Sequence, residues 1–152
     1  MSNVEITFYP NGLIKTKTTL KNELRHGLFE AFWNNGTIKE RLYFVNDKAE
    51  GYSEMFYKNG QIEGVGYYFN GNADGLFEWY CPSGEIESKI NYSNGLKNGL
   101  FEFYYKSGKV HISCFYKNDK EFGLWRKFYE SGALKEKVYY ADNGMVKKIE
   151  LF

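Results

Sequence analysis

The sequence predicts an all-β fold, an elongated, twisted antiparallel meander of repeated β-hairpins that forms a single-layer, solenoid-like sheet. Two observations lead to this prediction. Aromatic residues make up 20% of the 152 residues and glycine contributes 16, a composition that suits half-buried strands separated by turns. Glycines also recur on a fixed 24-residue period along the whole chain, so we expect one hairpin in each period.

Two series of glycines mark this period. Each series advances by 24 residues without an insertion, and two such series would coincide by chance only rarely. We expect both to occupy structural turns, because glycine adopts a left-handed backbone at no steric cost. The first series is Gly12, Gly36, Gly60, Gly84, Gly108 and Gly132, and the second is Gly27, Gly51, Gly75, Gly99 and Gly123.

The period predicts how the single domain, residues 1–152, is divided. A partial unit covers 3–26 and a closing strand covers 147–152. Truncated units of this kind are typical caps of repeat arrays. The full units between them cover 27–50, 51–74, 75–98, 99–122 and 123–146.

Each unit holds two short apolar-aromatic runs, such as LFEAFW and IKERLYF, separated by three residues that end in a first-series glycine. In Pro10–Gly12 and Pro82–Gly84, proline favours the first corner of a type I turn, and glycine accepts the left-handed position that follows. We therefore predict a three-residue loop closed by a G1 bulge rather than a two-residue type I′ turn. Turn residues mark a second connection at Asn46-Asp47, Asn70-Gly71, Asn94-Gly95, Asn118-Asp119 and Asp142-Asn143.

This loop assigns side chains to the two faces of the sheet, because residues two apart in a strand share a face. One face becomes uniformly apolar, and we expect it to be the core face. In the unit at Gly27 it carries Leu28, Phe32, Ile38, Leu42 and Phe44.

The opposite face is predicted to carry columns of aromatic residues among lysines and arginines. Two interpretations remain open: a solvated face whose aromatic rings are covered by Lys and Arg stems, or a recognition surface for a partner. The candidate partner-binding residues are Phe29, Trp33, Tyr57, Phe77, Trp79, Phe101, Phe103, Tyr105, Trp125 and Tyr129.

Composition also excludes some classes of protein. Lys and Arg (20) nearly balance Asp and Glu (19), which argues against a nucleic-acid partner. No apolar run approaches the roughly 20 residues that span a bilayer, and the first residues lack the pattern of a secretion signal. We expect a cytoplasmic protein, or an exported or envelope protein if a signal peptide has been removed.

Catalytic, metal and disulfide chemistry are not expected. One glutamate recurs per unit, but equivalent residues lie two strands, roughly 10 Å, apart, whereas the ligands of a calcium ion lie within about 2.6 Å of it. Cys81 and Cys114 are separated by three strands, about 14 Å, which exceeds the roughly 7 Å span of a disulfide. His26 and His111 stand apart from each other. We therefore predict no enzyme, no metal and no cofactor; the recurring carboxylates are Glu30, Glu54, Glu78 and Glu102.

Two segments carry a resemblance to a known family: GLFEFYYKSG at Gly99–Gly108 and YFNGNADG at Tyr68–Gly75. The chain resembles the MORN-repeat family over nearly its whole length, most closely the bacterial variant class, with local departures at Asp47, Cys81 and Asp119. The resemblance implies an elongated, twisted antiparallel sheet and an antitoxin-like or immunity role, while other members are tied to membrane surfaces and phospholipids. It brings no active site.

We therefore expect a non-enzymatic protein-interaction or scaffold module whose partner is a protein such as a toxin. The alternative is a membrane-surface or envelope-associated scaffold that binds lipid head groups. Near-neutral charge and the lack of an amphipathic helix make this membrane contact the less favoured expectation. Unpaired sheet edges at Val4–Tyr9 and Lys147–Phe152, or a sheet face, predict a homodimer.

Overall fold

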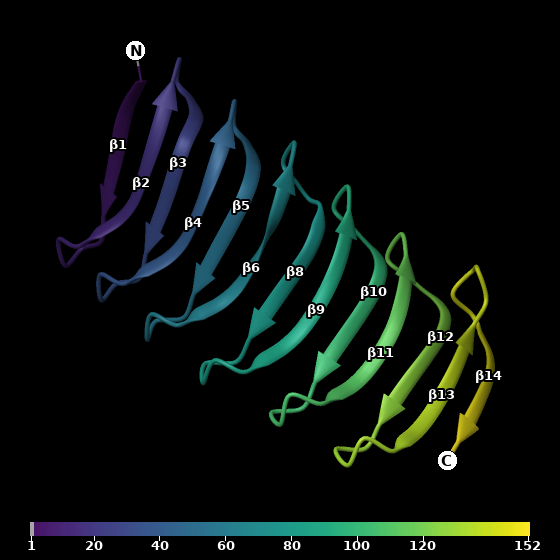
Figure 1. The fold of residues 1–152 in the computed structure, drawn as a ribbon. Coiled ribbons are helices and arrows are strands. Elements are labelled where there is room, and N and C mark those ends of the chain that lie inside the picture. The colour runs from purple at the N-terminus through teal and green to yellow at the C-terminus, as the bar shows by residue number, and fades with distance from the viewer. Residues whose placement is uncertain (1) are drawn as a thin grey trace.

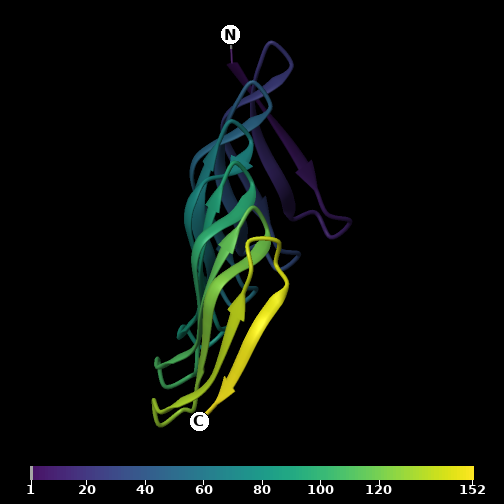
Figure 2. The ribbon, with the colours of Figure 1, turned by 90° about the vertical axis from the view of Figure 1, so that its right-hand side faces the viewer.

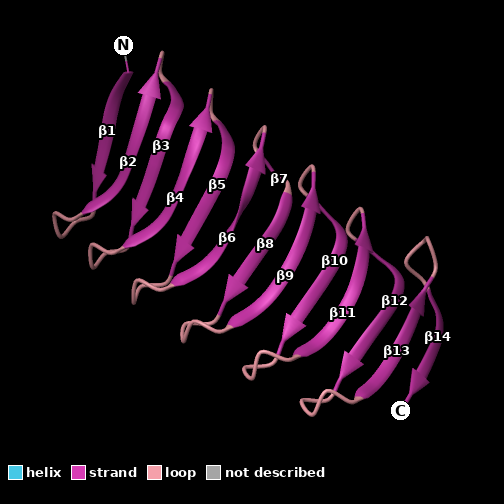
Figure 3. Cartoon of the chain, in the orientation of Figure 1, coloured by secondary structure: helices cyan, strands magenta, loops and turns pink. Residues whose placement is uncertain are grey.

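A computed structural model describes residues 2–152 of the chain. These residues form fourteen strands and no helix, which confirms the all-β prediction (Figures 1 and 3). The strands are β1 Ser2–Phe8, β2 Ile14–Lys21, β3 Leu24–Phe32, β4 Ile38–Val45, β5 Lys48–Phe56, β6 Ile62–Phe69, β7 Asn72–Ala73, β8 Gly75–Tyr80, β9 Ile86–Ser93, β10 Leu96–Tyr104, β11 Val110–Lys117, β12 Lys120–Phe128, β13 Leu134–Tyr140 and β14 Val146–Leu151.

The strands follow one another across one antiparallel sheet in the order of the chain, and the two-residue strand β7 pairs with β6 beside β8. The two termini therefore lie at opposite ends of the sheet (Figure 1). Figure 2 shows the hairpins one behind another in a single layer. The sheet is not closed, and β1 and β14 form its two ends.

The loops that contain the first-series glycines all have the same geometry. In the loop between β5 and β6, the Tyr57 amide donates to the Gln61 carbonyl at 2.8 Å, and the Gly60 amide donates to the Tyr57 carbonyl at 2.9 Å. Gly60 has a φ of 87°, the left-handed conformation that closes a G1 bulge. The predicted three-residue loop is confirmed. These loops form one long side of the sheet, which we call the loop edge.

The opposite long side carries two-residue turns. Val45 pairs with Lys48, and both intervening residues have positive φ, 48° at Asn46 and 65° at Asp47, as a type I′ turn requires. The last connection differs. Between β13 and β14 the Ala141 amide donates to the Met145 carbonyl, so Asp142-Asn143 belongs to another three-residue loop rather than to a two-residue turn.

A β-bulge in each hairpin reverses the predicted faces of the first strand, while those of the second strand largely hold. Phe32 pairs with Ile38 as the loop requires, but Ala31 pairs with Glu40, so Lys39 is an extra residue in its strand. An extra residue shifts every later side chain of one strand relative to its partner. The remainder of the hairpin is therefore paired one residue away from the predicted register.

For this reason only half of the predicted core face is right: Leu42 and Phe44 of the second strand are buried, but Leu28 of the first strand lies on the other face. Leu42 is buried as expected, but it pairs with Phe29 and not with Leu28. Leu28 pairs with Tyr43, whose ring is exposed. The core lies on the face that carries the Phe29 column, which we call the packed face. Its buried apolar residues are Leu42, Phe44, Phe77, Ile90, Phe101, Cys114 and Val138. We call the other side the open face.

Second-series glycines lie where a strand bends. Arg41 pairs with Glu54 and Tyr43 with Glu50, so three residues that begin at Gly51 lie opposite Leu42 alone. Gly51 has a φ of 83°, which a side chain would strain. All eleven glycines of the two series have positive φ.

Candidate functional site

The ten candidate residues do not form one exposed surface. Phe77 and Phe101 are 3% and 4% exposed in the centre of the packed face, where Phe29 and Trp125 occupy equivalent places. Trp79 and Phe103 lie two residues further along the same strands, nearer to the loop edge, and the Phe103 ring is exposed. The other four, Trp33, Tyr57, Tyr105 and Tyr129, directly precede the three-residue loops. A binding role for the set stays a prediction.

The aromatic residues at the loop edge connect neighbouring hairpins. Tyr57 Oη donates to the Tyr80 carbonyl at 2.7 Å, which joins one loop to the end of the next hairpin's first strand. Three equivalent bonds repeat along the edge: Tyr9 Oη to the Phe32 carbonyl, Trp33 Nε1 to the Phe56 carbonyl and Tyr105 Oη to the Phe128 carbonyl. These residues thus stabilise the array in addition to presenting half-buried rings.

Lysine and arginine stems cover several of these rings, as the first interpretation of the aromatic columns supposed. Lys39 Nζ lies 4.8 Å from the centre of the Trp33 ring. On the packed face, Lys97 Nζ lies 5.2 Å from the Phe101 ring centre. Such contacts are worth about 0.5–1 kcal/mol at exposed sites, so they help to shield the rings without sealing them.

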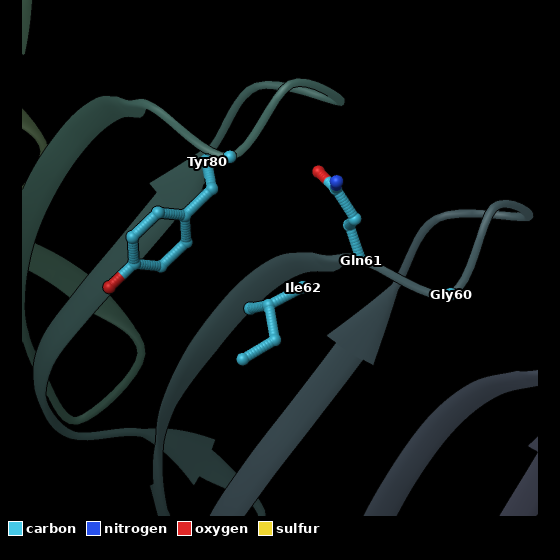
Figure 4. Close-up of a pocket in the computed structure, with 5 residues that line it drawn as sticks. Gly60, Gln61, Ile62 and Tyr80 are labelled. Atoms are coloured by element: carbon cyan, nitrogen blue, oxygen red, sulfur yellow. The ribbon is translucent and has the colours of Figure 1, made fainter.

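A shallow pocket of about 480 Å³ opens at the loop edge between two neighbouring hairpins. Ile62 at the start of β6 and Tyr80 at the end of β8 provide its apolar wall, and Gln61 lies at its mouth between the two loops (Figure 4). Gly60 and Gly84 complete the lining. Gln61 Oε1 lies beside Gly84, at 3.6 Å from where a Cβ of that residue would be, which is an ordinary contact distance.

A second pocket, of about 300 Å³, lies two repeat periods further along the edge. Val110 takes the place of Ile62, Phe128 that of Tyr80, and Lys109 that of Gln61. Gly132 and Ser131 complete the lining. Because four strand spacings of about 4.8 Å separate equivalent points, the two pockets are roughly 19 Å apart. We call them the paired notches.

One pattern in the sequence points to these notches, although none of the predicted site residues belongs to it. An aliphatic residue recurs two positions after each first-series glycine, and two residues of this series, Ile62 and Val110, line the notches. The series is Ile14, Ile38, Ile62, Ile86, Val110 and Leu134.

Tyr80 keeps its proton at neutral pH. Burial, and then the neighbouring Glu78 carboxylate, raise the pKa of Tyr80 above its ordinary value. The Tyr80 hydroxyl donates to Glu78 Oε2 at 3.3 Å, and Lys89 Nζ lies 2.9 Å from Glu78 Oε1. The first notch therefore has a neutral aromatic wall beside a charge pair.

The open face carries two rows of cross-strand neighbours. The charged row runs from β2 to β14, each residue directly opposite the next: Lys17, Glu30, Arg41, Glu54, Val65, Glu78, Lys89, Glu102, Ser113, Arg126, Lys137 and Glu150. The apolar row lies one pleat away, on the side of the two-residue turns. It contains Leu28, Tyr43, Tyr52, Tyr67, Leu76, Asn91, Leu100, Phe115, Leu124 and Tyr139.

Residues of the charged row pair with one another within the chain. Arg41 reaches Glu30 at 3.4 Å and Glu54 at 3.2 Å. These side chains are partly exposed, and exposed ion pairs contribute only about 0–1 kcal/mol each. The row is therefore a patterned surface rather than a major source of stability.

The described residues offer no centre for metal chemistry. Within 2–152, no group of three or more His, Cys, Asp and Glu side chains could hold a metal ion. Cys81 and Cys114 are both free thiols, and burial raises the pKa of Cys114 to about 12, which keeps it protonated. Helices long and apolar enough to cross a membrane are absent from this range as well.

Comparison with known proteins identifies the family of the repeat. A search of curated proteins found no match. The family model described as the MORN repeat variant matches five times, at residues 25–46, 49–72, 73–94, 97–118 and 123–142. Repeats of this kind are in general binding modules for proteins or membranes rather than catalysts. Because the five matches cover well over half of the chain, the chain belongs to the MORN repeat variant family.

Proposed function

We propose that this chain is a non-enzymatic scaffold that binds an extended segment of a protein partner along its loop edge. The observation that carries this proposal is the pair of equivalent notches, each with an aliphatic and an aromatic wall. Apolar pockets with a few polar groups at the mouth are the usual form of a binding site. A notch repeated along one edge suits a ligand that extends along that edge.

The spacing of the notches specifies the ligand. An extended peptide advances about 3.3 Å per residue, so a separation of roughly 19 Å corresponds to about six residues. A partner segment with two apolar side chains about six residues apart would fill both notches. The mouth residues Gln61 and Lys109 carry the polar side chains that would bond its main chain.

The experiment selects random twelve-residue peptides on the purified chain by phage display and measures the affinity of the enriched peptides. We expect enrichment of peptides with two large apolar residues about six positions apart. The double variant Ile62→Ser and Val110→Ser should bind them on the order of tenfold or more weakly, because each notch loses its aliphatic wall.

A matched control separates this effect from general loss of apolar surface. Leu96 is 41% exposed, close to the 40% of Ile62, but it lies beside a two-residue turn on the opposite edge. Leu96→Ser should leave peptide affinity unchanged. Equal losses in the control and in the double variant, with both folded by circular dichroism, would rule out the loop edge as the site.

The finer version of this function is an antitoxin or immunity factor whose partner is a toxin. It rests on the resemblance to the bacterial variant class alone. Co-expression with candidate toxins tests it: the wild-type chain should restore growth and the Ile62→Ser, Val110→Ser variant should not. Equal protection by both chains would separate any such role from the notches.

A second candidate is a membrane-surface scaffold that binds lipid head groups. It is favoured by the general binding of this family's repeats to membranes and by the exposed rings of the apolar row. Sedimentation with vesicles of neutral and of anionic lipid tests it. Co-sedimentation that disappears when Tyr43 and Tyr67 are changed to serine would support it, whereas a chain that stays in the supernatant would exclude it.

A further inference from the structure

We infer that a second copy of this chain covers the open face, related to the first by a twofold axis that runs parallel to the strands between β8 and β9. The apolar row lies on the side of the two-residue turns, away from the loop edge that carries the paired notches, so the inference goes beyond the proposed function; the two surfaces adjoin at Glu78, which accepts a hydrogen bond from Tyr80. It rests on the exposure of the apolar row and on the order of charges in the charged row.

The apolar row exposes more ring surface than a solitary sheet face usually does. Tyr43 and Tyr67 are 54% and 55% exposed, and Tyr52, Leu76 and Phe115 are exposed as well. Tyr52 and Tyr67 are in contact, with ring centres 5.2 Å apart. Contiguous exposed apolar patches are uncommon on monomeric proteins and mark interaction sites. The sheet has one layer, and nothing within residues 2–152 packs over this face.

The twofold axis brings matching rows together. Rotation about an axis parallel to the strands keeps each residue at its height along the strand and reverses the order of the strands. The apolar row of one copy therefore lies over the apolar row of the other, and the charged row over the charged row. The result is an apolar centre beside a polar rim, which is the usual anatomy of an interface.

Reversal of strand order also brings opposite charges together. At the centre, Glu78 faces Lys89 of the second copy, and Lys89 faces its Glu78. Toward the ends of the sheet, Glu30 faces Lys137 and Lys17 faces Glu150. One pair of like charges, Arg41 with Arg126, lies between the centre and these two outer pairs. The other face-to-face symmetry has its axis across the strands, along the charged row. It would place each charged residue opposite the same residue of the second copy, so that like charges meet. Charge complementarity of this kind selects the partner and its orientation.

Sheet twist confines the contact to the centre of the molecule. Two twisted sheets that pack face to face cross at about 30°, so their ends separate. The residues of the apolar row nearest to the axis are Leu76 and Asn91, flanked by Tyr67 and Leu100, and the central charges are Glu78 and Lys89. These two charges therefore decide the outcome of the test.

The test uses two charge reversals, Glu78→Lys and Lys89→Glu, and sedimentation equilibrium over a range of concentrations. We expect the wild-type chain to dimerise and each single variant to associate on the order of tenfold or more weakly, because like charges then meet twice across the axis. Mixed in equal amounts, the two variants should form a heterodimer at least as tight as the wild-type dimer. In that mixture one chain brings two positive charges and the other two negative charges.

The mixture separates the interface from the fold. Both reversals break the ion pair between Glu78 and Lys89 within their own chain, and mixing cannot restore that pair. Recovery on mixing therefore reports contact between chains. Lys106→Glu, on an exposed loop, serves as the control and should dimerise like the wild type. A monomeric wild type, or a mixture no tighter than the separate variants, would overturn the inference, and so would a monomer that binds lipid vesicles through the apolar row.

Discussion

The packed face is filled in two different ways, and the difference shows how a single-layer sheet builds a core. Around Phe101 the ring and the buried thiol of Cys114 come from one unit and face each other across β10 and β11. Two units earlier, toward the N-terminus, Ser53 and Gly66 take the corresponding places. The ring of Phe77, from the next unit, covers Gly66, and its nearest atom lies 2.3 Å from where a Cβ would be.

The comparison teaches that the repeat determines the backbone but not the packing. The glycines of both series repeat strictly, so the hairpins share one shape apart from the last connection. The core is shared, because a large side chain from one unit compensates for a small one in its neighbour. Stability should therefore depend on particular junctions rather than on equal contributions from each unit.

The largest expected effect comes from the junction that supplies its own core. Phe101→Ala should lower the free energy of unfolding by about 3–5 kcal/mol, because it leaves a cavity beside Cys114 and removes ring contacts with Tyr116. Ser53→Ala should cost only about 1 kcal/mol, since it loses one hydrogen bond to the Gly66 carbonyl. Urea denaturation measures both. Equal losses would mean that the two junctions do not differ.

A double-mutant cycle tests whether Phe77 really compensates for Gly66. Gly66→Ala should cost about 1–3 kcal/mol because its Cβ collides with the Phe77 ring. Phe77→Leu removes that collision, so Gly66→Ala should cost much less in its presence, a coupling of about 0.5–3 kcal/mol. Strict additivity of the two changes would show that the ring and the glycine are independent.

The turn chemistry made the fold predictable, while a local irregularity made the faces unpredictable. Proline at Pro10 and Pro82 and the left-handed glycines correctly indicated three-residue loops. Nothing in residue type distinguished Lys39 as the extra residue of a bulge, yet that single residue moved Leu28 to the open face. The recurring aliphatic residue of each unit was visible in the sequence, but the notches it lines were not, because they arise between hairpins and not within one.

Alkaline pH should weaken the junction around Phe101 specifically. Burial raises the pKa of Cys114 from 9.0 to about 12, so the folded chain keeps a proton that the unfolded chain loses above pH 9. The contribution of Cys114 to the free energy of unfolding is therefore fully present below pH 9. It falls as the pH rises toward 12, by up to about 1.4 kcal/mol per pH unit.

Urea denaturation at pH 8, 9 and 10 measures this dependence. Cys114→Val keeps the volume of the side chain without the thiol and should reduce the loss of stability between pH 9 and pH 10 by about 1 kcal/mol. Tyr116, whose pKa burial also raises to about 12, begins to contribute only above its ordinary value of 10. An unchanged slope in Cys114→Val would locate the titrating group elsewhere.

The smallest expected effect concerns Trp125, which occupies the place that Phe101 and Phe77 take in earlier units. Its ring packs between Tyr116 and Tyr140, but among residues 2–152 its buried Nε1 has no hydrogen-bond partner. A buried unsatisfied donor costs about 1–3 kcal/mol, whereas the smaller phenyl ring loses some apolar contact. Trp125→Phe should therefore be neutral or stabilising by up to about 1 kcal/mol.

Trp33→Phe supplies the contrast, because Trp33 Nε1 donates to the Phe56 carbonyl at 2.9 Å. That substitution breaks a bond between hairpins and should destabilise the chain by about 1 kcal/mol. The two changes are chemically identical, so opposite signs in thermal denaturation would show that the local partner of the indole N–H decides the result. If both variants lose the same stability, the Trp125 Nε1 must also donate a hydrogen bond. The proposed difference between the packed face near β12 and the loop edge would then not exist.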